Sequence, residues 1–391
     1  MRLLFIALLL LINAFHTSYS SSERALPSEC IPETFLGHLQ KGTWNCVCES
    51  LESIKGNLDK KTVITMQVPG RLGNRMLVFA LMLAFKRVLG LRAYLHSNVL
   101  EDINHYFPSA TQIPSLERHF CLPFEAWDYM MPEVQSLNAT ELSRGHTIAF
   151  WTKLRLMDSI LNERLQLMDF LKKVEPELRR TFVFKEDIQN YVSLLIQQAR
   201  DSYKENYLRR KKKKHKKPPN LERLNITLVG VHVRKRDADV SMVNRYNLPK
   251  LSPSYYLEAM HLYQKKFKNV IFMVVSDEMK WVEDNLLPRR GSAFIYPAGH
   301  GHVNCRTSVA LDLALLAACH HTILSYGTFS FWGGWLSGGH RILPNHVFDV
   351  TPMNDPFDNT LNSFRLPDVG TLGLSNEQKM SLGRSSFKDI D

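Results

Sequence analysis

Apolar strand patterns alternate with amphipathic helix patterns along the second half of the chain, and this alternation is the strongest constraint on the fold. The strand patterns cover residues 226–233, 269–276, 293–297 and 322–325, and the helix patterns cover residues 253–268, 278–286, 308–319 and 328–339. An earlier unit has a strand pattern at 61–68, a helix pattern at 75–90 and a strand pattern at 91–95. Repeated strand–helix units predict an α/β fold with a parallel, doubly wound sheet.

The two blocks of strand–helix units predict two Rossmann-like domains that face a cleft. A chain of 391 residues is long enough for both. The predicted order is a signal-anchor or signal peptide (1–20), a stem (21–60), an N-terminal domain (61–208), a basic loop (209–224), a C-terminal domain (225–370) and a tail (371–391).

The N-terminus predicts entry into the secretory pathway. An apolar segment runs from Leu3 to Phe15 after a single arginine. As a helix these residues would span about 20 Å, less than the ~30 Å of a typical hydrocarbon core. That length fits a cleavable signal peptide, with the small residues Ser18 to Ser20 as a cleavage site, and also an uncleaved signal-anchor in a thin membrane.

Two further features agree with a body in an oxidising lumen. Asn138 and Asn225 each begin an N-x-T glycosylation acceptor. The six cysteines are even in number and compatible with disulfide bonds. Six cysteines allow fifteen pairings, so the sequence assigns none. Cys319 ends an apolar helix pattern, and we expect it to be a buried free thiol.

The basic run from Arg209 to Lys217 accounts for most of the net charge. The chain has 49 Lys and Arg against 38 Asp and Glu, and this run supplies eight positive charges of the resulting +11. Such a run can be a nuclear address or a nucleic-acid patch. Two prolines follow it and no aromatic residues are interleaved with it, which favours a solvated loop and no nucleic-acid partner.

Three turns lie where strands of the predicted sheets end, which is where doubly wound folds bind ligands. In "GRLGN", Gly70 and Gly73 allow a close backbone approach and Asn74 stands at a helix start. In "SYGTFS", Ser325 and Gly327 lead into a helix whose first residues, Thr328 to Ser330, could hold an anion. Each turn can also be an ordinary turn with a capped helix. The P-loop pattern is absent from the whole sequence.

The third turn, "RKRDAD", carries the most charge. Asp237 and Asp239 could hold a divalent metal ion, but three cations precede them and work against that reading. Surface salt bridges are a second possibility. A diphosphate is the third, because arginine binds phosphate oxygens in pairs. His232 and Arg234 alternate with valines, so both point to one face of their strand.

The quoted turns, with "VVSDEMKW" and the block "DLALLAACHHTILSYGTFSFWGGWLSGG", resemble the α-1,2-fucosyltransferase family over roughly residues 63–345. The resemblance implies a GT-B fold with a C-terminal GDP-fucose-binding domain and an N-terminal acceptor-side domain. It implies transfer of fucose from GDP-β-L-fucose, with inversion, to a galactose-terminated glycan through its 2-hydroxyl. It also implies no metal cofactor and a single-pass type II protein anchored in the Golgi membrane, with the catalytic body in the lumen.

The family's H-x-R-R-x-D motif falls on His232, Arg234, Lys235 and Asp237. The resemblance implies that Arg234 binds the diphosphate, that His232 positions the donor and that Asp237 orients Arg234 or contacts the nucleotide. Lys235 replaces the second arginine and loses its paired hydrogen bonds, and Arg236 could compensate.

Further positions follow from the same resemblance. Its donor-binding set is completed by these residues: Gly73, Asn74, Asp277, Ser325, Gly327, Thr328 and Ser330. Arg75 departs from the family, because it replaces a neutral amide. The general base is unassigned.

Two other functions remain open. A lumenal glycan-binding or nucleotide-sugar-binding protein that has lost catalysis would share the fold, and the departures at Lys235 and Arg75 leave room for it. A fucosyltransferase of different linkage, such as a peptide O-fucosyltransferase, shares the "GRLGN" theme, although the last block favours the glycan enzymes.

Overall fold

The structure is a computed structural model of the 391-residue chain. It describes residues 63–64, 71–88, 90–115, 164–213, 221–236, 250–300, 305–344 and 363–366. The N-terminal apolar segment, Asn138 and both Asp237 and Asp239 lie outside these ranges. No helix in the described ranges is long and apolar enough to cross a membrane.

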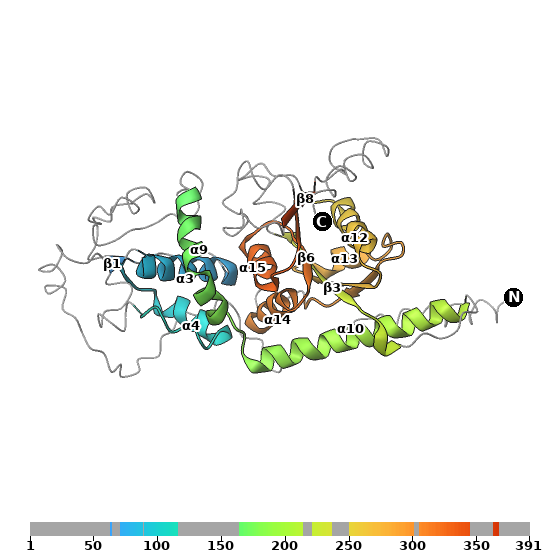
Figure 1. Cartoon of the computed structure of the whole chain (residues 1–391), viewed down its shortest axis with the longest axis horizontal. Coiled ribbons are helices and arrows are strands. Elements are labelled where there is room, and N and C mark those ends of the chain that lie inside the picture. The colour runs from blue at the N-terminus through green and yellow to red at the C-terminus, as the bar shows by residue number, and fades with distance from the viewer. Residues whose placement is uncertain are drawn as a thin grey trace, which may run out of the picture.

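A six-stranded parallel sheet forms the C-terminal part of the molecule (Figure 1). Its strands are β3 (Thr227–Val233), β4 (Val270–Ser276), β5 (Phe294–Pro297), β6 (His321–Ile323), β7 (Arg341–Pro344) and β8 (Ser363–Leu366). The spatial order is β5-β4-β3-β6-β7-β8. The chain builds the sheet from β3 through β4 to β5, then returns to place β6 on the other side of β3 and continues through β7 to β8. This is the strand order of the Rossmann fold, and the predicted doubly wound sheet is confirmed.

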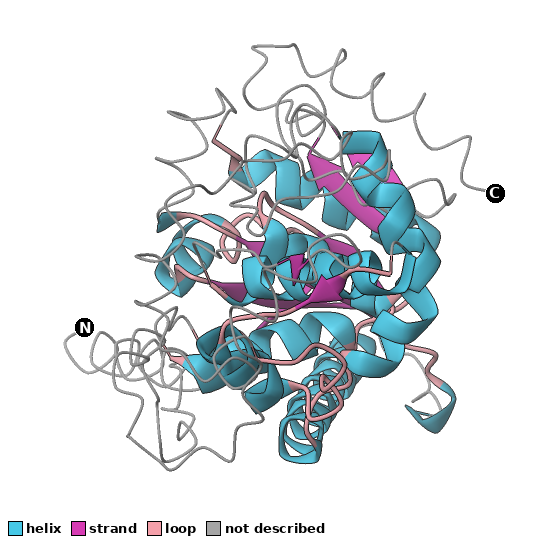
Figure 2. Ribbon diagram, turned by 90° about the vertical axis from the view of Figure 1, so that its left-hand side faces the viewer, coloured by secondary structure: helices cyan, strands magenta, loops and turns pink. Residues whose placement is uncertain are grey.

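Helices cover both faces of this sheet, as Figure 2 shows. Helices α12 (Pro253–Lys266) and α13 (Met279–Asn285) pack on one face, and α14 (Arg306–Ala317) and α15 (Thr328–Ser337) pack on the other. The alternation of strand side chains explains the two layers. Val229, Val231 and Val233 of β3 join the core under α12, whereas Leu228 joins the core under α14.

A smaller α/β unit precedes the large sheet. Strands β1 (Val63–Ile64) and β2 (Arg92–Ala93) are parallel, and helix α3 (Leu72–Val88) connects them. Three further helices follow: α4 (Ser97–Tyr106), α9 (Arg164–Thr181) and the long α10 (Glu186–Lys213), with a 3-10 turn, η1, at Leu221–Arg223. Helix α3 is apolar on nearly all sides, and α4, α9 and α15 surround it.

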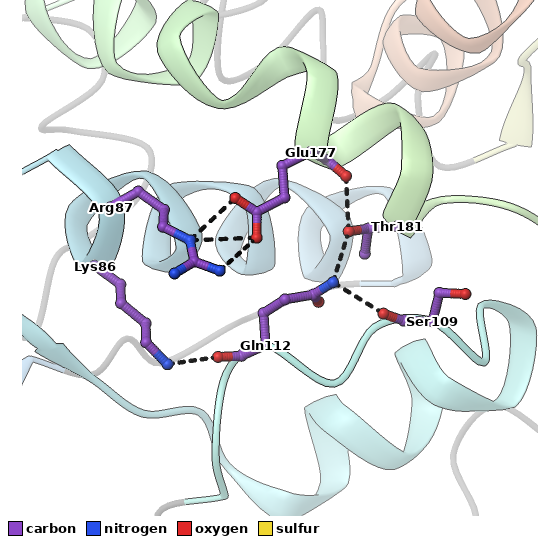
Figure 3. Close-up of polar contacts among 6 residues, drawn as sticks. All are labelled: Lys86, Arg87, Ser109, Gln112, Glu177 and Thr181. Atoms are coloured by element: carbon purple, nitrogen blue, oxygen red, sulfur yellow. Dashed lines mark hydrogen bonds and ion pairs between the residues drawn. The ribbon is translucent and has the colours of Figure 1, made fainter.

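Polar contacts fix the far end of α3 (Figure 3). Arg87 pairs with Glu177 of α9, with Nη2 and Oε1 2.7 Å apart, and Lys86 donates to the carbonyl of Gln112 at 2.7 Å. The Gln112 amide in turn donates to the hydroxyl of Thr181 at 3.1 Å. Exposed ion pairs of this kind each contribute at most about 1 kcal/mol, so their main effect is to fix the register of α3 against α9.

Two predicted boundaries are wrong. Helix α3 begins at Leu72, three residues before the prediction, so Gly73 and Asn74 lie in its first turn and not in a preceding loop. The loop predicted from residue 209 starts later, because Arg209–Lys213 form the end of α10. Lysine and arginine are good helix formers, and positive charge stabilises a helix C-terminus.

The two cysteines in the described ranges differ. Cys305 is disulfide-bonded. Cys319 is a buried free thiol, as predicted, and burial raises its pKa to about 12.

Candidate functional site

The candidate site lies at the carboxyl ends of β3 and β6, the neighbouring strands at which the strand order reverses. In doubly wound sheets this switch point opens the crevice that binds ligands. His232 is the second-last residue of β3, and Ser325 follows β6 closely. The sheet therefore brings together two of the three turns that the sequence analysis singled out.

A buried hydrogen-bond cluster joins β3 to α15. The Nδ1 atom of His232 lies 2.5 Å from the hydroxyl of Ser330 and 3.2 Å from that of Ser325. The Ser330 hydroxyl also accepts the backbone N–H of Ser325 at 3.1 Å. All three side chains are buried, and the ring of Phe329 lies 5.0 Å from the imidazole. The cluster fixes the orientation of the His232 ring.

His232 is neutral in this environment. Burial, and to a smaller extent the nearby charge of Arg234, together lower its pKa from 6.5 to about 3. The Ser330 hydroxyl accepts a hydrogen bond from the backbone N–H of Ser325, and it can donate its own hydrogen to Nδ1 of His232. That arrangement leaves the ring proton on Nε2, so the imidazole can donate one hydrogen bond and cannot add a positive charge.

The guanidinium of Arg234 lies against Gly327, at the N-terminus of α15. A Cβ atom on Gly327 would collide with Nη1 of Arg234. Gly327 also has φ of 111°, a conformation that side chains other than glycine rarely adopt. Glycine is thus required at this position for two reasons, its backbone conformation and the space that Arg234 occupies. The absence of a side chain lets the guanidinium lie over the positive end of the α15 helix dipole.

The first turn of α3 meets the first turn of α15 at the same place. The hydroxyl of Thr328 donates to the side chain of Asn74 at 2.7 Å, and the indole of Trp332 donates to the carbonyl of Gly73 at 2.9 Å. A Cβ atom on Gly73 would come within 2.7 Å of the Phe329 nitrogen. The small unit and the large sheet are therefore in contact at the N-termini of two helices, whose backbone N–H groups favour an anion.

The cations that follow Arg234 have other partners. The ammonium of Lys235 is buried, donates to the carbonyl of Leu251 at 2.6 Å and lies 4.2 Å from the Trp281 ring centre. Asp277 accepts the backbone N–H of Lys235 at 2.8 Å. Arg236 is exposed and lies 3.3 Å from Glu278. Lys235 and Asp277 therefore fix the end of β3 to the end of β4.

Arg75 also has a partner of its own. It forms an ion pair with the fully buried Asp102 of α4, with Nη1 and Oδ2 2.5 Å apart. The charge that departs from the family pattern is thus balanced within the small unit.

The structure brings most of the predicted residues to one edge of the sheet. His232, Arg234, Ser325, Gly327 and Ser330 form one group, with Gly73, Asn74 and Thr328 beside it. Asp237 lies outside the described residues. Sequence reasoning missed Trp332 and Phe329, although their block was noted, because nothing local shows that they contact Gly73 and His232. Within the described residues no three His, Cys, Asp or Glu side chains gather as around a metal ion.

Fold and site together define an α/β protein of the Rossmann type with a site for an anion at its switch point. The strand order is that of the Rossmann fold, and a neutral histidine, an arginine and two helix N-termini meet at its switch point.

Comparison with known proteins gives the family. Residues 146–367 match glycosyl transferase family 11, which is more than half of the chain, and the chain belongs to this family. Galactoside alpha-(1,2)-fucosyltransferase 2 of Rattus norvegicus is 24% identical over 307 residues, 76% of this chain and 73% of the relative. Galactoside alpha-(1,2)-fucosyltransferase 1 of the same species is 29% identical over 281 residues, 71% of this chain and 64% of the relative. The predicted resemblance is confirmed, and the protein is an enzyme of the fucosyltransferase type.

Among solved structures, a mutant of Arabidopsis thaliana FUT1 in complex with GDP is similar to 75% of this chain, with 74% of that chain covered. The sequence identity is 13% and the TM-score is 0.45.

Proposed function

We propose that the protein transfers L-fucose from GDP-β-L-fucose, with inversion, to the 2-hydroxyl of a terminal galactose on a glycan acceptor. Membership of glycosyl transferase family 11 supports the reaction type, and the names of the curated relatives support the α-1,2 linkage. The observation that carries the proposal is the position of Arg234 over the N-terminus of α15, beside the buried cluster of His232, Ser325 and Ser330.

The chemistry follows from where charge develops. When GDP leaves, the sugar becomes oxocarbenium-like and negative charge grows on the β-phosphate. Arg234 can donate two parallel hydrogen bonds to phosphate oxygens, and the first N–H groups of α15 are already oriented towards the same region. Because these groups are fixed before reaction, they need no reorganisation as the charge grows.

His232 has a positioning role in this scheme. Its neutral state allows it to donate from Nε2 without adding to the positive charge around Arg234. Contacts with Ser325 and Ser330 hold the ring in its orientation. Lys235 and Asp277 support the proposal indirectly, because their contacts fix the strand end from which Arg234 extends.

Several finer features belong to the same proposal. The small unit that contains α3 represents the acceptor-side half of a two-domain GT-B enzyme, and its contact with α15 encloses the donor. Transfer needs no metal ion, because Arg234 and the helix dipole supply the positive charge at the phosphates. The apolar segment Leu3 to Phe15 anchors a type II Golgi protein, which agrees with the disulfide bond at Cys305.

The test is a transfer assay with purified protein, GDP-fucose and a panel of acceptors. The panel contains terminal β-galactosides, the same glycans with a 2-deoxygalactose, and acceptor peptides for O-fucosylation. Fucose on the galactosides, absence of product on the 2-deoxy glycans and an α-1,2 linkage by NMR are expected. Fucosylated peptide would refute the acceptor assignment. GDP binding without transfer to any acceptor would favour the alternative, a binding protein that has lost catalysis.

A further inference from the structure

Exposed basic side chains gather at the amino edge of the six-stranded sheet, opposite the candidate donor site. All six strands are parallel, so the helices that lead into them end at this one edge. Two helix ends supply the charge, α10 before β3 and α12 before β4. We define the amino-edge basic surface by the exposed basic residues in and directly after these helix ends: Arg209, Arg210, Lys212, Lys265, Lys266 and Lys268.

Contacts place the two helix ends on the same edge. The hydroxyl of Tyr203 in α10 donates to the side chain of Asn269 at 3.3 Å, and the Asn269 amide donates to the carbonyl of Asn225 at 3.1 Å. Lys268 directly precedes Asn269. Tyr203 also contacts Phe294, the first residue of β5, with ring centres 5.2 Å apart. Helix α10 therefore passes this edge near Tyr203 and continues to Lys213, about three further turns along the helix.

The charge at the end of α10 exceeds what the helix needs. One or two cations in the last turn are enough to balance a helix dipole, and like charges three or four residues apart destabilise a helix. Five consecutive basic residues nevertheless end α10. Arg209 pairs with Glu205 at 3.2 Å, and no acidic residue occurs in the sequence between Glu205 and Glu222.

Two kinds of partner fit this surface poorly, a membrane and a single-stranded nucleic acid. The large apolar side chains that are exposed within the described residues are Val183 and Leu194, and neither belongs to this surface. Membrane-surface helices need buried apolar area as well as charge. Binding of single-stranded nucleic acid uses exposed aromatic faces, whereas the ring of Tyr207 lies under Lys211 and stacks on Tyr203.

The surplus of exposed positive charge fits best a flexible polyanion that is bound by charge alone. The disulfide bond at Cys305 indicates an oxidising compartment, where sulfated glycan chains are the common linear polyanions. We propose that the amino-edge basic surface binds a sulfated glycan chain, independently of the donor site on the opposite edge of the sheet.

Calorimetric titration of the protein with a heparin-derived dodecasaccharide tests this proposal. The test variant combines Arg210→Gln with Lys212→Gln, and the matched control combines Lys173→Gln with Arg180→Gln, which are exposed on α9 and remove the same charge. We expect a roughly 5- to 30-fold weaker Kd in the test variant and less than about 2-fold change in the control. The affinity of the wild-type protein should fall with added NaCl.

A second variant, Lys265→Gln with Lys268→Gln, tests the α12 half of the surface and keeps the proposal testable if α10 frays in the first. We expect it to weaken binding to a similar extent. Equal weakening in the α9 control would show that net charge alone acts and would overturn the proposal. So would equal affinity for a 12-nucleotide single-stranded DNA, or tighter binding to vesicles that contain 30% phosphatidylserine. In all variants the transfer rate should stay unchanged, because the surface lies away from the donor site.

Discussion

In the buried cluster of His232, Ser325 and Ser330, we expect removal of the Ser330 hydroxyl to have the largest effect on stability and on GDP binding. It accepts the buried N–H of Ser325 at 3.1 Å and contacts Nδ1 of His232 at 2.5 Å. Ser330→Ala leaves that N–H without its acceptor, which costs about 1–3 kcal/mol of unfolding free energy for a buried donor. It also removes the bond that orients the imidazole, and loss of one such bond should weaken GDP binding roughly 2- to 13-fold.

The control lies in the same helix. Ser337 donates to the carbonyl of Gly334 at 2.9 Å and is only half-buried, so Ser337→Ala should change the unfolding free energy by less than about 0.5 kcal/mol. Urea unfolding and calorimetric titration with GDP measure both effects. If Ser330→Ala matches Ser337→Ala in both measurements, the cluster does not hold the site, and the reasoning is refuted.

Three further predictions follow from the same contacts. Gly73→Ala should cost about 1–3 kcal/mol in a urea melt, because its Cβ would press on backbone atoms of α15; an unchanged midpoint would show that the two helices can separate freely. The pKa of His232 is lowered from 6.5 to about 3, so the unfolded state binds more protons between these values and stability falls as the pH is lowered from 6.5. His232 should contribute at most about 1.4 kcal/mol per pH unit to this loss of unfolding free energy, and His232→Asn should make the pH dependence shallower. Equal slopes for the variant and the wild type would contradict the assignment. Chelation with EDTA should leave initial transfer rates intact, whereas loss of activity that Mn²⁺ restores would favour a metal site at Asp237 and Asp239.

Much of the fold could be predicted from periodicity. The strands β3 and β4 and the helices α12, α14 and α15 are long or strongly patterned, and their predicted bounds differ from the structure by at most two residues. Strands β7 and β8 were missed, because each has only four residues and short apolar runs give no reliable period.

The start of α3 could not be predicted from local signals. Glycine and asparagine usually indicate a turn, and Gly73 and Asn74 suggested one. The structure shows that glycine is needed there because α15 approaches closely, a contact between residues more than 250 positions apart in the sequence.

The candidate site was predictable to the extent that it depends on strand alternation. His232 and Arg234 alternate with the buried Val231 and Val233, which gives their common face directly. The groups that the Lys235 ammonium contacts in the structure were not predictable from the sequence. Its charge suggested phosphate, but Leu251 and Trp281 reach it only through tertiary packing, so its part in donor binding stays a prediction.

The central claim is that Arg234 binds the diphosphate of the donor as charge develops on it. Its most direct test is the initial transfer rate of Arg234→Lys with saturating acceptor, alongside a thermal melt. Lysine keeps the charge but cannot donate two parallel hydrogen bonds, so we expect a loss of roughly 10²- to 10³-fold in rate with little change in Tm. Lys235→Arg, which restores the family residue, should retain activity and serves as the control for substitution at this strand end. A near-wild-type rate for Arg234→Lys would contradict the account and remove Arg234 from the active site.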